Sequence, residues 1–182
     1  MRTRIARTPG RQHHRQMKEL PDVSSFSVKH LLRLEASIVT EFRARGLVRT
    51  NNKPLGDIAE QVVLAARGGV LEPNSMKSHD VTDANGRKIQ VKAMGGRMAG
   101  QGGKFSPFRS FDFDTAVFLV FAGDTFDLAL AREVAPDEIE AVARYSAHTN
   151  GRQPTLRQVQ GLGADVTDEM QQAYASLDSG PA

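Results

Sequence analysis

The residues best suited to catalysis or metal binding lie in one polar stretch between positions 78 and 94. It holds a carboxylate, Asp80, and then an alternating segment in which Gln90 and Lys92 are separated by one residue. Carboxylate and amide oxygens, with water, are ligands for hard cations such as Mg²⁺ or Mn²⁺ rather than for zinc. A lysine beside such a cation can orient or deprotonate the water that attacks a phosphodiester. The stretch therefore predicts a site for metal-assisted hydrolysis.

Whether these side chains meet depends on the register of the hairpin that the stretch predicts, because a slip of one residue turns every side chain to the other face. With a two-residue turn, Asp80 would point away from Gln90. With a three-residue loop over 84–86, in which Gly86 is left-handed, Asp80 would lie opposite Gln90 and share a face with Lys92. Gly86 favours this second register. The alternative is a surface hairpin whose polar face is simply solvated.

A fourth candidate, Glu60, lies in the segment LGDIAEQVVLAAR, which predicts a helix over residues 55–67. This helix is apolar on nearly every side, so it should pack deep against a sheet. A buried carboxylate without a partner costs several kcal/mol, so Glu60 there needs a cation, a metal or a route to solvent. Alternatively, Glu60 lies in the exposed first turns, where an acid interacts favourably with the helix dipole.

The order of these residues resembles the PD-(D/E)xK, or restriction endonuclease-like, nuclease superfamily. The resembling pattern is Glu60 on a helix, His79-Asp80 at a strand, and the strand Ile89-Gln90-Val91-Lys92. It covers roughly residues 55–132. Two positions depart from the usual pattern: His79 stands where the name-giving proline would be, and Gln90 replaces the usual acid. A Q-x-K form of this kind resembles the branch of Mrr-type restriction enzymes.

The resemblance implies a metal-dependent DNA endonuclease of the restriction, genome-defence or DNA-repair type, with Mg²⁺ or Mn²⁺ as cofactor. By the logic of the family, the Asp80 carboxylate, the Gln90 oxygen and the Val91 backbone carbonyl would hold the metal. Glu60 would reach the metal directly or through water, and Lys92 would serve the nucleophile. Because Gln90 is neutral, we expect weaker metal affinity and one ion rather than two. The alternative is a catalytically inactive DNA-binding protein with a nuclease-like fold.

Basic residues outside this pattern are candidate DNA contacts. The first 18 residues hold six Lys and Arg and no acid, which suits an arm that binds phosphates and equally suits a solvated tail. A glycine-rich segment over residues 95–110 is predicted to be a mobile loop that closes on DNA, or an ordinary flexible connector. The predicted DNA-binding residues are Arg2, Arg4, Arg7, Arg97, Lys104 and Arg109. The resemblance also implies a homodimer as one form of assembly, since many nucleases of this type act as dimers.

The pattern of apolar residues and turn signals predicts an α/β (α+β) core, with a mixed sheet of about five strands flanked by helices and extra N- and C-terminal helices. The expected division is a basic arm over 1–23, a nuclease-like core over 24–148 and a C-terminal helical extension over 149–182. We expect helices from Ser24 or Ser27 to Gly46 and over 55–67, about 137–148 and about 167–177. We expect strands over 70–72, 78–83, 88–94, 115–121 and 126–132.

The composition restricts the class of protein. The chain has no cysteine, which excludes disulfides and thiolate metal sites. Its hydrophobic fraction of 40% and charged fraction of 25% are ordinary for a soluble globular protein. The longest apolar run is too short to span a bilayer, and no apolar stretch follows the basic N-terminus as in a secretory signal. We therefore expect a soluble cytoplasmic protein without a membrane partner.

Overall fold

The computed structural model describes residues 20–50, 53–74, 78–95, 103–123 and 125–179. Two helices come first, α1 (Val28–Ala44) and α2 (Leu55–Arg67), and the bounds predicted for α2 are confirmed. Each helix is followed by a glycine in the left-handed region, Gly46 with φ of 72° and Gly68 with φ of 67°. The chain divides into one unit that runs to Ala36 and a second that begins at Ser37 and contains the sheet.

The second unit is built on a six-stranded mixed sheet with the order β1-β2-β3-β4-β5-β8. Only β3 and β4 run parallel, and the other neighbours are antiparallel. The mixed α/β class is thus confirmed, with one strand more than expected. The strands of this sheet are β1 (Val70–Leu71), β2 (Val81–Thr82), β3 (Lys88–Met94), β4 (Thr115–Phe121), β5 (Leu128–Val134) and β8 (Ala164–Asp165).

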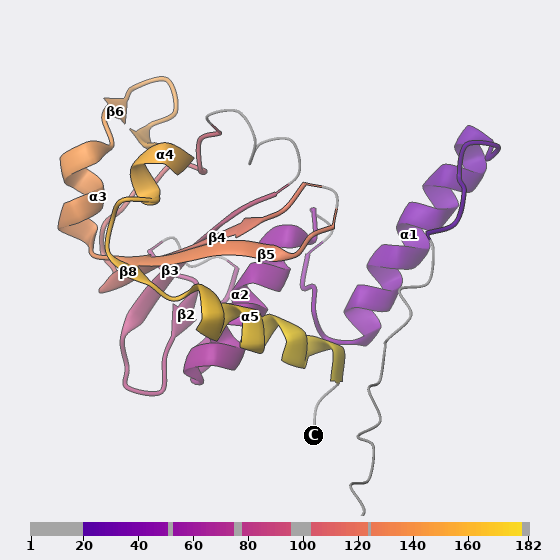
Figure 1. Ribbon diagram of the computed structural model, residues 1–182, viewed down its shortest axis with the longest axis horizontal. Coiled ribbons are helices and arrows are strands. Elements are labelled where there is room, and N and C mark those ends of the chain that lie inside the picture. Colours follow the sequence, from indigo (N-terminus) through magenta and orange to yellow (C-terminus); the bar gives the residue numbers. More distant parts are fainter. Residues whose placement is uncertain (1–19, 51–52, 75–77, 96–102, 124, 180–182) are drawn as a thin grey trace, which may run out of the picture. The chain divides into compact units, whose positions relative to one another are not determined.

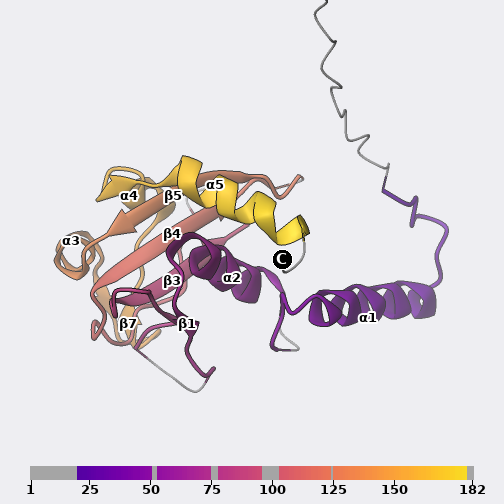
Figure 2. The ribbon, with the colours of Figure 1, turned by 90° about the horizontal axis from the view of Figure 1, so that it is seen from below.

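Two apolar layers cover the two faces of the sheet (Figure 1, Figure 2). On one face, α2 and α5 (Thr167–Ser176) lie side by side against inward side chains such as Ile89 and Val91. On the other face, α3 (Pro136–Val142), α4 (Leu156–Val159) and a phenylalanine cluster cover Met94 and Phe118. Because every side chain of β4 is buried, this strand is the centre of the fold.

The hairpin between β2 and β3 has the register that places the polar residues together. Val81 pairs with Ile89 and Thr82 with Lys88, and directly beyond this pairing the side chains of Asp80 and Gln90 are hydrogen-bonded to each other. Residues 84–86 form the loop, and Gly86 is left-handed with φ of 81°. The predicted three-residue loop is therefore confirmed, and with it the alternation that turns Ile89 to the apolar face.

Several predicted bounds are wrong, for local reasons. The strand predicted over 78–83 is reduced to Val81–Thr82, and the strand predicted over 126–132 begins only at Leu128, because Phe126 takes the left-handed conformation of a turn (φ 58°). The helix predicted over 137–148 ends at Val142. Beyond it the chain forms a hairpin of β6 (Tyr145–Ser146) and β7 (Gly151–Arg152), whose turn contains the left-handed Asn150.

The glycine-rich segment is a packed wall rather than a mobile loop over its described residues, 103–110. Phe105 and Phe108 are buried, and backbone hydrogen bonds tie Phe108 to Arg152 in both directions at 2.9 and 3.0 Å. A further bond runs from the N–H of Leu156 to the carbonyl of Gly103. This part of the prediction is corrected by burial, because aromatic side chains fix the segment to the sheet.

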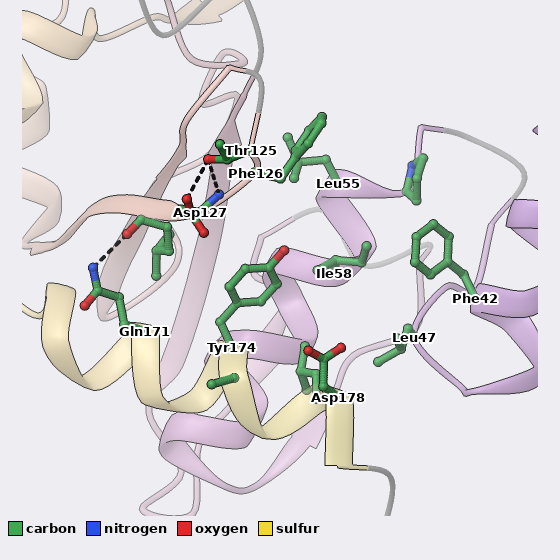
Figure 3. A pocket seen from close by; sticks show the side chains of 14 residues that line it. Phe42, Leu47, Leu55, Ile58, Thr125, Phe126, Asp127, Gln171, Tyr174 and Asp178 are labelled. Atoms are coloured by element: carbon green, nitrogen blue, oxygen red, sulfur yellow. Dashed lines mark hydrogen bonds between the residues drawn. The ribbon is translucent and has the colours of Figure 1, made fainter. Parts of the chain in front are cut away.

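A cavity of about 860 Å³ lies on the α2–α5 side of the sheet (Figure 3). Leu55 and Ile58 from α2 face Tyr174 from α5 across it, and Phe126 closes it beside Leu55. Its described lining residues include none of the four predicted site residues.

Among the described residues, no helix is both long enough and apolar enough to cross a bilayer.

Candidate active site

The four predicted site residues line one cavity of about 420 Å³ at the edge of β3. Residues from both faces of this strand reach it, Gln90 and Lys92 from one face and Val91 and Ala93 from the other. The cavity therefore lies at the strand's edge rather than on one side of the sheet. Its described lining residues are Lys53, Leu55, Gly56, Glu60, Asp80, Gln90, Val91, Lys92, Ala93 and Ser106.

The short length of β2 leaves this opening beside β3. Pairing between β2 and β3 covers only two residues of each strand, so the backbone of Val91 has no strand beside it on this edge. The Asp80 carboxylate takes the place of the missing strand, because its Oδ2 accepts the N–H of Val91 at 2.7 Å. The N–H and C=O of one strand residue point to the same side, so the Val91 carbonyl also faces the cavity.

The Gln90 amide lies between the groups that the resemblance assigns to a metal. Its Nε2 donates to Asp80 Oδ2 and lies 3.5 Å from the Val91 carbonyl oxygen. A cation bound by these two oxygens would occupy the same space. Rotating the amide by half a turn would replace the nitrogen with Oε1 and present a third oxygen.

Glu60 reaches the cavity from α2 and is held by a cation of the protein itself. Its Oε2 lies 2.5 Å from Nη2 of Arg49, and both side chains are largely covered, with 19% and 28% exposed. Glu60 is therefore not in an exposed first turn. It is a largely covered carboxylate with a compensating positive charge, as the first of the two predictions for this residue requires. Arg49 lies in the link before α2, and its own N–H donates to Asp57 at 2.6 Å.

Lys92 lies across the cavity, with its ammonium over an aromatic ring. Its Nζ is 4.8 Å from the centroid of Phe108, within the range of a cation–π contact. The Phe108 ring is itself buried and packs against Phe111 and Phe113. The buried ring therefore holds the Lys92 ammonium in place through this cation–π contact.

Burial shifts the pKa of all three ionisable groups toward the neutral form. Desolvation, reinforced by the charge of Asp80, raises the pKa of Glu60 to about 7 against the opposing effect of Arg49. Desolvation also raises the pKa of Asp80, although the hydrogen bond from Val91 and the charge of Lys92 oppose it. Burial lowers the pKa of Lys92, against the attraction of Asp80 and with help from the positive charge of Arg109.

The donors at this edge suit a hard cation. In the described part of the chain, no three His, Asp or Glu side chains are arranged to hold a metal. The available set is instead mixed: the carboxylates of Asp80 and Glu60, the Val91 carbonyl and the rotated Gln90 amide. An all-oxygen set with room for water fits Mg²⁺ or Mn²⁺.

The other predicted residues have less direct outcomes. Lys104 and Arg109 lie exposed on the wall segment, and Arg109 is near enough to influence Lys92. Arg2, Arg4, Arg7 and Arg97 lie outside the described residues.

Two polar neighbours of the site have structural roles. His79 is buried and bonded to Ser78 and Thr82, and it lies 3.5 Å from Glu72. Asp83 accepts backbone N–H groups within the hairpin loop. Neither residue lines the cavity at the edge of β3.

Sequence reasoning missed Arg49 and Phe108. Arg49 stands in a short link without periodicity, and only its separation of eleven residues from Glu60 joins them, a spacing that carries no signal. Phe108 belongs to the apolar core, and its contact with Lys92 depends on how the wall folds back over the sheet. The charge of Glu60 on an apolar helix was the one available hint that a cation lay nearby.

The Phe108 ring provides a test of how Lys92 is positioned. We expect Phe108→Leu to lower the free energy of unfolding by about 1–3 kcal/mol, because it removes a buried ring. We also expect any activity of the site to fall by roughly tenfold or more, because the ammonium loses its support. Phe113→Leu, in the same cluster but not beneath Lys92, is the matched control. Equal losses of activity in the two variants, measured beside urea unfolding, would show that the ring acts through stability alone.

Comparison with known proteins adds no assignment to this geometry. No model of a known protein family matches the sequence, and no curated protein sequence matches it.

Proposed function

We propose that this chain is a metal-dependent DNA endonuclease that hydrolyses phosphodiester bonds. The observation that carries the proposal is the convergence of Glu60, Asp80, Gln90 and Lys92 on one cavity, in the register that the strand pattern predicts. Two carboxylates, an amide and a partly desolvated lysine match the parts that metal-assisted phosphodiester hydrolysis needs. The exposed Lys104 and Arg109 on the wall, with the basic N-terminal residues, add the positive charge that DNA would contact.

Each site residue has a distinct part in this proposal. Asp80 and the Val91 carbonyl would bind the metal first, because both face the open edge of β3. Gln90 would add its oxygen after the amide rotates, and Glu60 would complete the set directly or through water. When bound, the metal would stabilise negative charge that develops on the phosphate.

Lys92 would act as the general base. Burial lowers the pKa of its ammonium, so the neutral amine is more accessible than for a solvated lysine. The amine would accept a proton from water as the water oxygen bonds to phosphorus and one P–O ester bond breaks. The departing sugar oxygen then takes a proton from solvent, which balances the reaction.

A second candidate function, DNA binding without cleavage, is favoured by one specific observation. The Gln90 amide donates to Asp80, and Arg49 pairs with Glu60, so the carboxylates are satisfied without a metal. This candidate predicts salt-sensitive DNA binding that persists in Asp80→Asn and needs no metal.

Plasmid nicking tests the two candidates together. Supercoiled DNA is incubated with the protein in Mg²⁺ or Mn²⁺, in chelator, and after metal is restored. An endonuclease is expected to nick only with metal and to lose nicking in Asp80→Asn, whose amide can still accept the Val91 N–H and so preserve the hairpin. Retention of DNA on filters without nicking in any metal would favour the binding protein instead. Nicking that is equal in both forms would point to a contaminating nuclease.

A further inference from the structure

Arg49 lines a polar cavity that adjoins the cavity at the edge of β3. The cavity at the edge of β3 and a neighbouring one of about 210 Å³ are both lined by Glu60 and Asp80. The second cavity also contains Asp57 and Glu72, and Arg49 is the sole basic residue among its described lining residues. The guanidinium pairs with Glu60 and lines this second cavity, whereas Lys92 lines the cavity at the edge of β3.

The backbone of Arg49 is fixed, whereas its side chain makes bonds that can be exchanged. The N–H groups of Arg49 and Thr50 both donate to Asp57 Oδ2, at 2.6 and 2.9 Å. The guanidinium donates to Glu60 and, at 2.7 Å, to the Glu72 carbonyl. Since 28% of the side chain remains exposed, another acceptor can approach it from solvent.

Two positive groups cannot use the same carboxylate without cost. While Arg49 is paired with Glu60, a divalent cation beside Asp80 meets both a repelling charge and a carboxylate that already has a partner. A DNA phosphate is an acceptor that could bind Arg49 in place of Glu60, because guanidinium groups form bidentate hydrogen bonds with phosphate oxygens.

We propose that Arg49 is a latch that DNA releases: without DNA its guanidinium holds Glu60 and opposes metal binding, and a backbone phosphate draws it away and frees Glu60 for the metal. This inference rests on the nuclease function proposed above. DNA and metal then bind cooperatively, and by thermodynamic reciprocity each raises the affinity for the other. Arg49 acts through Glu60, so it is a positioning residue.

Calorimetric titration of Mn²⁺ into the full chain tests the latch, with and without a phosphorothioate duplex that keeps the backbone charge. For the unaltered protein we expect the duplex to tighten Mn²⁺ binding by about tenfold or more. For Arg49→Gln we expect Mn²⁺ to bind about tenfold more tightly without DNA, and the duplex to add little. Arg49→Lys keeps the charge and should retain part of the cooperativity. The matched control is Arg45→Gln, which breaks only an exposed pair with Glu41.

The outcomes separate the latch from the function beneath it. If Arg49→Gln binds Mn²⁺ as the unaltered protein does, with and without the duplex, the latch is overturned while the metal site stands. Weaker Mn²⁺ binding in Arg49→Gln without DNA would also overturn it, since the residue would then support the site. If no form binds Mn²⁺ under either condition, the proposed metal-dependent function and the latch fail together. Circular dichroism of each variant checks that it is folded.

Discussion

Replacement of Lys92 by methionine is expected to slow DNA cleavage by about 10²–10⁴-fold, the range lost when a positioned proton acceptor is removed. Methionine has nearly the same length and can still lie on the Phe108 ring, so packing is largely kept. Metal binding should not weaken, because a positive charge near Asp80 and Glu60 is removed rather than a ligand. Single-turnover cleavage and Mn²⁺ calorimetry measure the two effects separately.

Lys88 supplies the matched control for this prediction. It lies on the same strand as Lys92 and forms a surface pair with Asp112 at 3.1 Å. Lys88→Met should leave cleavage within about threefold and change the free energy of unfolding by less than about 1 kcal/mol, as for other exposed ion pairs. Equal cleavage rates in the Lys92 and Lys88 variants would remove Lys92 from the mechanism.

Gln90→Glu is expected to tighten Mn²⁺ binding by about tenfold or more, because it adds a charged oxygen ligand at the open edge of β3. Without metal, the same change should lower the free energy of unfolding by about 1–3 kcal/mol. The amide that donates to Asp80 becomes a carboxylate that repels it. Thermal unfolding in chelator and in Mn²⁺ should therefore show a lower starting stability and a larger gain from metal than in the unaltered protein.

Gln160→Glu introduces the same charge at an exposed position on the surface and is the control for a general effect of net charge. If both variants respond to Mn²⁺ alike, Gln90 does not face the metal. A Gln90→Glu variant that gains metal affinity but not cleavage would favour the non-cleaving candidate and place the deficiency elsewhere in the site.

The register of the hairpin was predictable because two independent signals agreed on it. Left-handed Gly86 set the loop length, and the alternation of Ile89 with Gln90 set the faces. Helix α2 and the strands β3 and β4 were predictable for the same reason, since each combines a strong apolar pattern with glycine or polar residues at its ends. These local signals were sufficient to predict that Asp80 and Gln90 lie close together.

The remainder of the site depends on contacts between segments far apart in the sequence. Arg49 meets Glu60 because Asp57 pins the preceding link, and no periodicity marks such a link. Lys92 meets Phe108 because the wall is tied to residues near position 152, which follow four more elements of the chain. Short elements such as β8 escaped prediction because two residues carry too little pattern to distinguish a strand from a turn.

The parallel pairing of β3 and β4 has a consequence for how this molecule can change over evolution. Parallel neighbours require a crossover, and here that crossover includes the wall that carries Phe108, Lys104 and Arg109. The register of the hairpin that carries Asp80 and Gln90 is set on the other side of β3, by β2 and Gly86. Insertions and deletions in the crossover can therefore alter the mouth of the cavity while Asp80 and Gln90 stay in register, so under the proposed function the substrate range can diverge there.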